Sequence, residues 1–208
     1  MTAVRVALTF DAEHPDHPAT DPIQNAERLL DLLGQREISA TFFIQSSWAN
    51  AYRHLAERIK GDGHLIGSHS HWHCLFPGMA SDGIANDLAR SRRILDAIAP
   101  TGHWFRLPGG SGHDDRRVLK AVRGAGYRHV GWTCGGNDWE PDRTVDEVAV
   151  PIIEHVRSAE EPVAVALLHS WPDPTTGAVA TILDQLGPDI EYVRLDQVEL
   201  EELPRHNP

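Results

Sequence analysis

The chain has 208 residues, and its 19 basic and 30 acidic residues give a formal net charge of −11 at pH 7. This length predicts one domain over residues 1–208, and fractions of 41% hydrophobic and 24% charged residues are typical of a globular protein. The acidic balance argues against nucleic acid and anionic membranes as partners, because both repel negative charge.

Two further features indicate the compartment. Cys74 and Cys134 are the only cysteines, too few for a disulfide scaffold, although a single disulfide between them is allowed. No segment resembles a secretion signal, and the apolar run 163–168 is far shorter than the roughly 20 residues that a bilayer requires. We therefore expect a cytoplasmic protein that does not enter a membrane.

Strands and helices alternate along the chain. Short runs rich in β-branched and apolar residues predict strands, and longer runs with apolar residues three or four apart predict helices. In chain order, we expect a strand over 4–10, a helix over 23–35, a strand over 39–44, a helix over 48–60, a strand over 64–68, a helix over 81–99, a strand over 103–107, a helix over 114–125, a strand over 129–133, a helix over 144–158, a strand over 163–168, a helix over 177–186 and a strand over 190–193. Pro151 lies inside one of these helices and predicts a kink or a break there.

This alternation indicates an α/β fold with a parallel sheet that is covered by helices on both faces. With about 30 residues in each strand–helix unit, the chain suits a closed or nearly closed barrel. A doubly wound open sheet is the alternative. In both architectures the active site lies at the carboxyl ends of the strands.

The reactive side chains follow five of the predicted strands. They lie in the segments 11–14, 69–74, 106–110, 137–139 and 169–171. Because the carboxyl ends of parallel strands meet at one edge of a sheet, we expect these segments to form a single site. Several tryptophans, among them Trp132 and Trp139, also lie at or just after strand ends, where their rings suit the wall of a cleft.

His69 and His73 have a spacing that places both imidazoles on one face of a helical turn, with His71 pointing away. Two histidines and one carboxylate form a common catalytic zinc set. Asp11 and Glu13 supply carboxylates, and they lie on the same side of an extended chain because one residue separates them. One of the two can bind the metal while the other stays free as a base.

Two more combinations suit catalysis. Arg106 ends a strand and can orient a nearby carboxylate, and Gly109 and Gly110 allow backbone N–H groups to approach a ligand. Asp138 beside His169 would raise the pKa of the imidazole and fix its tautomer, which suits a general acid. Without an acidic neighbour, a histidine at the end of a buried strand is better interpreted as part of the core.

Taken in order, these segments resemble the five motifs of the polysaccharide deacetylase superfamily, carbohydrate esterase family 4. The matching residues are Thr9-Phe10-Asp11, His69-Ser70-His71-Trp72-His73, Arg106-Leu107-Pro108-Gly109, Asp138-Trp139 and Leu167-Leu168-His169. The resemblance implies a distorted seven-stranded (β/α) barrel. It also implies metal-dependent hydrolysis of an N-acyl or O-acyl group, usually on an amino sugar.

The resemblance further implies a role for each matching residue. It assigns Asp11 as the general base, His69 and His73 as metal ligands, Arg106 as the partner of the base, Gly109 as an N–H donor to the oxyanion, Asp138 as the residue that tunes the histidine, and His169 as the general acid. Trp139 is a candidate substrate contact because its ring suits the wall of the cleft. Zinc is the expected metal, and cobalt, nickel and iron suit the same types of donor.

The chain departs from the family at the third metal ligand. The family has a second Asp directly after the base, and this chain has Ala12 there. We expect Glu13 to replace it, because one more methylene can offset a displacement by one residue. His14 and Asp16 are rival ligands, and Asp11 is another, which would leave Glu13 as the base.

The sequence therefore predicts a metal-dependent hydrolase that removes an acyl group, expected to be acetyl, from an amino sugar or a related small amide. A small molecule or a soluble oligosaccharide is the expected substrate of a cytoplasmic form. A cyclic-amide hydrolase on the same scaffold is one alternative. A carbohydrate-binding protein that has lost the metal is the other.

Overall fold

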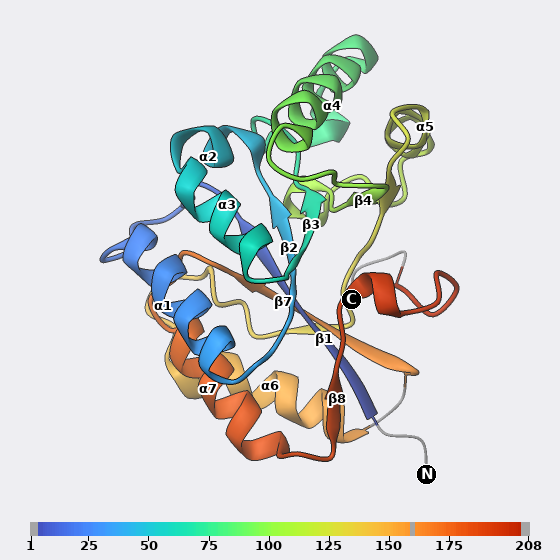
Figure 1. Cartoon of the computed structure of the whole chain (residues 1–208). Coiled ribbons are helices and arrows are strands. Elements are labelled where there is room, and N and C mark those ends of the chain that lie inside the picture. The colour runs from blue at the N-terminus through green and yellow to red at the C-terminus, as the bar shows by residue number, and fades with distance from the viewer. Residues whose placement is uncertain (1–3, 159–160, 205–208) are drawn as a thin grey trace.

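The chain folds around one curved sheet of parallel strands in the computed structural model, which describes residues 4–158 and 161–204 (Figure 1). The strands are β1 (Val4–Ala12), β2 (Thr41–Ile44), β3 (Leu65–Ser68), β4 (Trp104–Phe105), β5 (Arg128–His129), β6 (Cys134–Gly135), β7 (Val163–His169) and β8 (Ile190–Tyr192). The main path runs β5-β4-β3-β2-β1-β7-β6, and β8 pairs with the start of β1. The sheet curls into an incomplete barrel, which confirms the predicted distorted seven-stranded (β/α) barrel.

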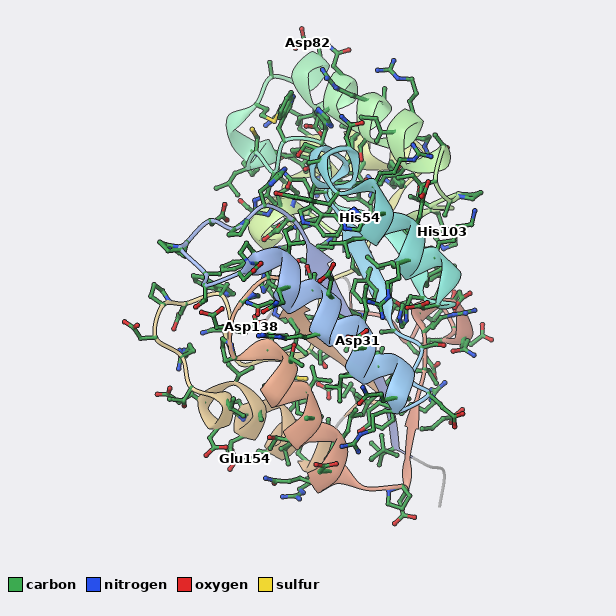
Figure 2. All side chains as sticks on the ribbon, turned by 60° about the vertical axis from the view of Figure 1, so that its left-hand side comes forward. Asp31, His54, Asp82, His103, Asp138 and Glu154 are labelled. Carbon is green, nitrogen blue, oxygen red and sulfur yellow. The ribbon has the colours of Figure 1, made fainter. Side chains whose placement is uncertain are left out.

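Helices cover the outside of this sheet. They are α1 (Pro22–Gln35), α2 (Ser46–Ala51), α3 (Arg53–Gly61), α4 (Ser81–Asp96), α5 (Arg116–Gly124), α6 (Val145–Ser158) and α7 (Thr175–Leu186), with short 3-10 turns η1 (Phe76–Gly78), η2 (Pro108–Gly110) and η3 (Leu195–Gln197). Their polar faces point outward, as Asp82 on α4 and Glu154 on α6 illustrate (Figure 2). None of the helices in the described residues is long and apolar enough to cross a membrane.

Alternation along β1 sends its side chains to two different environments. Leu8, Phe10 and Ala12 belong to the largest apolar core, which the sheet forms with helices including α1, α6 and α7. Thr9 and Asp11 are equally buried but lie on the other face of the strand, inside the curve of the sheet. The functional end of β1 therefore carries polar groups inside the barrel while its other face holds the strand in the core.

Three predicted elements differ from the structure. The helix expected over 48–60 is divided into α2 and α3 at Tyr52, whose φ of −122° and ψ of 53° are not helical. The strand expected over 129–133 ends at His129, and the next strand, β6, pairs with β7 rather than with β4. Of the kink or break expected at Pro151, the break is wrong, because α6 runs through this residue. Pro151 lies on the exposed side of α6, where the backbone carbonyl that loses its partner can bond to water.

His64 is a buried histidine that makes the fold sensitive to acid. Its side chain is 7% exposed, and its Nδ1 accepts a hydrogen bond of 3.1 Å from the backbone N of Ala40. Burial lowers the pKa of His64 from 6.5 to about 4. Between these two pH values, the imidazole of His64 is protonated in the unfolded chain and neutral in the folded chain. Stability therefore falls as the pH decreases from about 6.5 to about 4.

We expect His64→Asn to remove this dependence, because the amide oxygen can accept the same hydrogen bond and does not titrate. Between pH 7 and pH 5, the wild type should lose about 2 kcal/mol more unfolding free energy than the variant. Urea unfolding at both pH values measures this difference. An equal loss in both proteins would show that His64 is not the group that titrates.

Candidate active site

The carboxyl ends of the strands meet around one cavity of about 430 Å³. Asp11 on β1 and His169 on β7 are register partners, and Arg106 directly follows β4. Eight of the predicted site residues line the cavity: Asp11, Glu13, His69, His73, Gly109, Asp138, Trp139 and His169. Arg106 is fully buried and bonds to Asp11 in the wall. The structure therefore brings all five predicted segments together.

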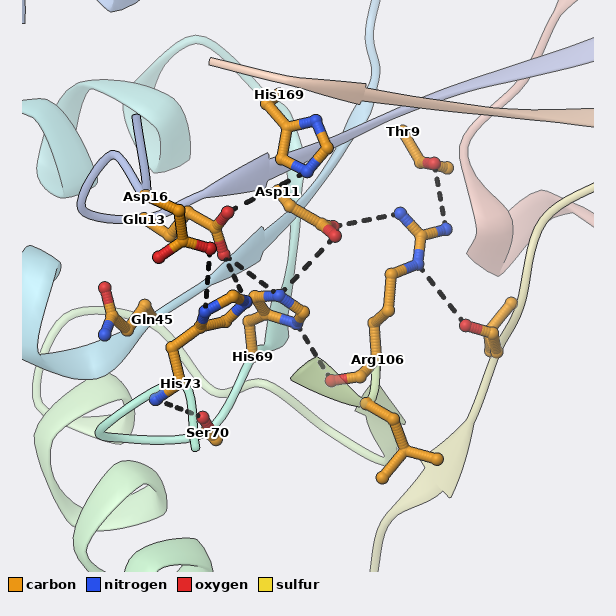
Figure 3. Close-up of polar contacts among 12 residues, drawn as sticks. Thr9, Asp11, Glu13, Asp16, Gln45, His69, Ser70, His73, Arg106 and His169 are labelled. Carbon is orange, nitrogen blue, oxygen red and sulfur yellow. Dashed lines mark hydrogen bonds and ion pairs between the residues drawn. The ribbon is translucent and has the colours of Figure 1, made fainter. Parts of the chain in front are cut away.

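Glu13, His69 and His73 form a group that could hold a metal ion (Figure 3). One ligand atom from each lies within 4.8 Å of the other two. Glu13 Oε2 is 3.1 Å from His69 Nε2 and 2.8 Å from His73 Nε2. No second group of this kind occurs in residues 4–158 and 161–204.

The donor atoms of this group suit a divalent cation. His69 Nδ1 donates a hydrogen bond of 2.9 Å to the carbonyl oxygen of Arg106, so neutral His69 carries its lone pair on Nε2. That lone pair faces Glu13 Oε2, which is buried and receives no conventional hydrogen bond within the described chain. Two electron-rich atoms so close together need a proton or a metal ion between them. Two imidazoles and one carboxylate match the ligands of catalytic zinc, so the residues present fit such an ion.

The pKa values in this group reflect attraction between the carboxylate and the imidazoles. Burial raises the pKa of Glu13, but the contacts with His69 and His73 outweigh it and hold this pKa well below its usual value. Burial lowers the pKa of His73, and the contact with Glu13 outweighs it in the opposite direction, so the pKa is raised. Glu13 is therefore held as a carboxylate anion, the form in which it can bind a metal ion.

The rival ligands lie elsewhere. Ala12 is fully buried in the core on the other face of β1 and points away from the cavity. The ring of His14 packs against Tyr52, with 5.8 Å between the ring centroids. Asp16 Oδ2 is 3.7 Å from Nδ1 of His73, whereas Glu13 contacts Nε2 of that ring. The geometry therefore favours Glu13 over His14 and Asp16 as the third ligand.

Asp11 is held by the buried guanidinium of Arg106. Arg106 donates through Nη1 to Asp11 Oδ1 at 3.0 Å and through Nη2 to Thr9 Oγ1 at 2.9 Å. The guanidinium also lies 4.3 Å from the ring centroid of Phe43, which supports it from one side. The second carboxylate oxygen, Oδ2, lies 3.5 Å from His69 Nε2. Asp11 thus has one oxygen fixed by Arg106 and one beside the metal-ligand group.

His169 is oriented by Asp138. Asp138 Oδ1 accepts from His169 Nδ1 at 2.8 Å, and Asp138 Oδ2 accepts from the backbone N of His169 at 2.8 Å and from Thr175 Oγ1 at 2.6 Å. Burial lowers the pKa of His169, but the charge and hydrogen bond of Asp138 outweigh it and raise the pKa to about 9. His169 Nε2 faces Glu13 Oε1 at 3.8 Å, so the proton that it carries is in the site. No pattern in the sequence predicts Thr175.

Gly109 and Trp139 complete the lining of the cavity. Gly109 has φ of +55°, a left-handed conformation that favours glycine, and an added Cβ would lie 3.2 Å from Leu75. Trp139 is 39% exposed, and its ring stacks on that of His17 with 6.4 Å between centroids. The exposed indole therefore offers a flat apolar surface beside the reactive groups.

Asp87, which sequence analysis missed, holds the histidine loop from behind. Its buried carboxylate on α4 accepts from the backbone N of His71 at 2.8 Å and of Trp72 at 3.1 Å. The loop needs this support because His73, which is not glycine, has φ of +58°. A usable signal exists, since Asp87 is a charged residue next to Leu88 on the apolar face of its helix. His71 points away from the cavity as predicted, toward a serine hydroxyl on α2.

The fold is an incomplete (β/α) barrel, and the five segments that converge in it carry the motif residues of carbohydrate esterase family 4. A model described as "Polysaccharide deacetylase" matches residues 2–130. That match covers more than half of the chain, so the chain belongs to the polysaccharide deacetylase family.

Curated relatives share moderate identity along most of the chain. A peptidoglycan-N-acetylglucosamine deacetylase of Bacillus cereus is 28% identical over 186 residues, which cover 87% of this chain and 81% of that protein. A chitooligosaccharide deacetylase of Rhizobium leguminosarum bv. trifolii is 28% identical over 172 residues, covering 81% and 73%. Other relatives are longer, and the chain spans 63% of a second Bacillus cereus deacetylase and 48% of the Bacillus subtilis protein YlxY.

Solved structures share the fold. The Bc1960 peptidoglycan N-acetylglucosamine deacetylase is 25% identical with a TM-score of 0.78, covering 94% of this chain and 88% of that one. A family 4 acetyl xylan esterase from Clostridium thermocellum, in complex with a cobalt ion, is 28% identical with a TM-score of 0.74, covering 93% and 89%. The family 4 pseudoenzyme BA3943 from Bacillus anthracis, 23% identical with a TM-score of 0.77, covers 100% of this chain and 70% of its own, and shows the fold alone.

Proposed function

We propose that this protein is a metal-dependent hydrolase that removes an acyl group, expected to be acetyl, from the nitrogen of an amino sugar or a related small amide. One observation carries the proposal: the ligand atoms of Glu13, His69 and His73 converge in the cavity that Asp11 and His169 also line. The family, and relatives named as deacetylases of peptidoglycan and chitooligosaccharides, support an amino-sugar substrate.

Glu13, His69 and His73 would hold the ion, and zinc is the proposed metal because two imidazoles and one carboxylate suit it best. When bound, such an ion polarises the acyl carbonyl and lowers the pKa of a water molecule. Deacetylases of carbohydrate esterase family 4 use a divalent metal ion, and the acetyl xylan esterase related to this chain contains cobalt.

The side chains around the ligands would carry the protons. Asp11 takes the proton of the attacking water on Oδ2, since Arg106 already bonds Oδ1. The backbone N–H of Gly109 donates to the negative charge that develops on the acyl oxygen. His169 then passes its Nε2 proton to the leaving nitrogen, while Asp138 stabilises the imidazolium before the transfer. The products are the carboxylic acid and the free amine.

We expect purified wild-type protein to bind one divalent metal ion per chain and His73→Ala to bind much less, because one of three ligand atoms is lost. Elemental analysis after removal of free metal measures this. His54→Ala is the matched control, because His54 is exposed on α3 and should keep the full metal content (Figure 2). An unchanged stoichiometry in His73→Ala would contradict the assignment of this ligand.

A substrate panel tests the reaction. It compares N-acetylated sugars and oligosaccharides with cyclic imides, using metal-loaded enzyme and measuring the released acid or opened ring. Release of acetate from the sugars supports the proposal, and turnover of imides alone supports a cyclic-amide hydrolase. A protein that binds sugars without metal or turnover would be a binding module. The proposed cytoplasmic location adds the expectation that soluble oligosaccharides are turned over faster than intact cell wall.

A further inference from the structure

Glu13 depends on the backbone beyond the end of its strand. β1 ends at Ala12, so Glu13 is the first residue after the strand. Ala12 cannot serve as ligand, because a methyl side chain has no ligand atom, and this one is buried in the core on the opposite face. The carboxylate of the ligand group is Glu13, which lies beyond the last residue of β1 that pairs with β2. Its Oε2 nevertheless lies within 3.1 Å of both imidazoles of the ligand group.

Gln45 bonds to the peptide groups on both sides of Glu13. Gln45 directly follows β2, whose last residue is the register partner of Ala12. The backbone N of Gln45 donates to the carbonyl oxygen of Ala12 at 2.9 Å. Its side-chain Oε1 accepts from the backbone N of His14 at 2.9 Å. The first bond fixes the peptide before Glu13, and the second fixes the peptide after it.

These two bonds together set the backbone angles of Glu13. The angle φ relates the preceding peptide plane to the residue, and ψ relates it to the following plane, so a residue with both planes fixed has a fixed direction of Cβ. This matters for a glutamate, which has one more rotatable bond than aspartate and loses more side-chain freedom when it binds an ion.

Gln45 is itself held firmly. Its side chain is buried, with 4% exposed, and Figure 3 draws it beside the ligand group. The backbone carbonyl oxygen of Gln45 accepts a hydrogen bond from the backbone N of Ala49, in the first turn of α2. The backbone of Gln45 is thus fixed by β1 on one side and by α2 on the other, and its amide can act as a rigid support.

We propose that Gln45 is the positioning residue that makes Glu13 usable as the third metal ligand, in compensation for Ala12. The inference rests on the proposed function, because it concerns the affinity of the same site for its metal. Gln45 does not contact the ion or the substrate in this role. It acts through the backbone of Glu13 and His14.

Two substitutions separate the acceptor of Gln45 from its bulk. Gln45→Met keeps the length of the side chain and removes the acceptor, whereas Gln45→Glu keeps an oxygen at the same place. We expect Gln45→Met to lower the zinc affinity by about 10-fold to 100-fold, the usual effect of losing a support behind a metal ligand. Gln45→Glu should retain wild-type affinity or exceed it, since its added negative charge favours a cation.

Competition with a chromophoric chelator measures the zinc affinity of each purified apo-protein, and thermal unfolding checks its fold. Gln35→Met is the matched control, because Gln35 is the exposed last residue of α1 and does not line the cavity. Should Gln45→Met not fold, Gln45→Asn, whose amide is one methylene too short to reach His14, replaces it with the same expected loss.

Wild-type zinc affinity in the variant that lacks the acceptor would overturn the proposal. An equal loss in Gln45→Glu would also overturn it, because the acceptor would then not be the cause. Weaker zinc binding by Gln45→Met, together with wild-type or tighter binding by Gln45→Glu, supports the proposal. A wild-type protein that binds no zinc, cobalt, nickel or iron is a different result, since it overturns the proposed function itself.

Discussion

Glu13→Ala is expected to remove bound metal and activity together, whereas Asp11→Asn is expected to keep the metal and lose activity. Glu13 supplies the only carboxylate oxygen of the ligand group in the described chain, and two imidazoles alone bind zinc weakly. Asp11 lies beside that group with one oxygen on Arg106, so its loss removes a proton acceptor. Loss of a general base should lower kcat by about 10²-fold to 10⁴-fold. Metal analysis and turnover of the same samples measure both effects.

The variants of Glu13 and Asp11 need controls for folding, because both side chains are buried. Glu13→Gln keeps the size of the side chain and removes its charge, so it should also lose metal. Asp11→Asn can still accept from Arg106, but it leaves a fully buried guanidinium without its counter-charge. Its metal content is therefore compared only in protein whose circular dichroism is native. The reverse pattern would exchange the two roles, and metal retained in both variants would point to Asp16 or His14.

Much of the fold follows from local patterns in the sequence. β1 and β7 are apolar and buried, and the helices between strands carry their apolar residues at helical spacing. The errors occur where a local pattern does not decide. β6 has two residues and exists because Cys134 and Gly135 pair with β7, a contact across about thirty residues of sequence that no short window contains. Cys134 is also free rather than disulfide-bonded, like Cys74.

The same distinction between local patterns and distant contacts applies to the site. Residues that follow strands could be found from sequence, because the carboxyl ends of parallel strands meet at one edge and because their order resembles a family. Three supporting residues, Thr175, Asp87 and Gln45, were not predicted, since each reaches the site from a distant element. Thr175 bonds to Asp138 from the start of α7, Asp87 bonds to the histidine loop from α4, and Gln45 bonds to His14 from the end of β2. Only Asp87 carries a sequence signal, a charge on an apolar helix face.

His169→Ala is expected to lower kcat by about 10²-fold to 10⁴-fold while the metal content stays at the wild-type level. The imidazole donates through Nδ1 to Asp138, and its Nε2 faces the site, 3.8 Å from Glu13 Oε1. Removing it leaves the leaving nitrogen without a proton donor, but it removes no atom of the ligand group. Steady-state kinetics across pH and metal analysis of the same preparation measure the two effects separately.

The support behind His169 predicts a graded series. Asp138→Asn should lower kcat less than His169→Ala, because the imidazole remains but loses the charge that raises its pKa. Thr175→Val removes one hydroxyl donor to Asp138 and should cost about tenfold at most, the effect of one hydrogen bond. His103→Ala, an exposed histidine beside β4, is the control with unchanged kinetics (Figure 2). If His169→Ala retains wild-type rates at every pH, the ring is a buried structural histidine and another group must protonate the leaving nitrogen.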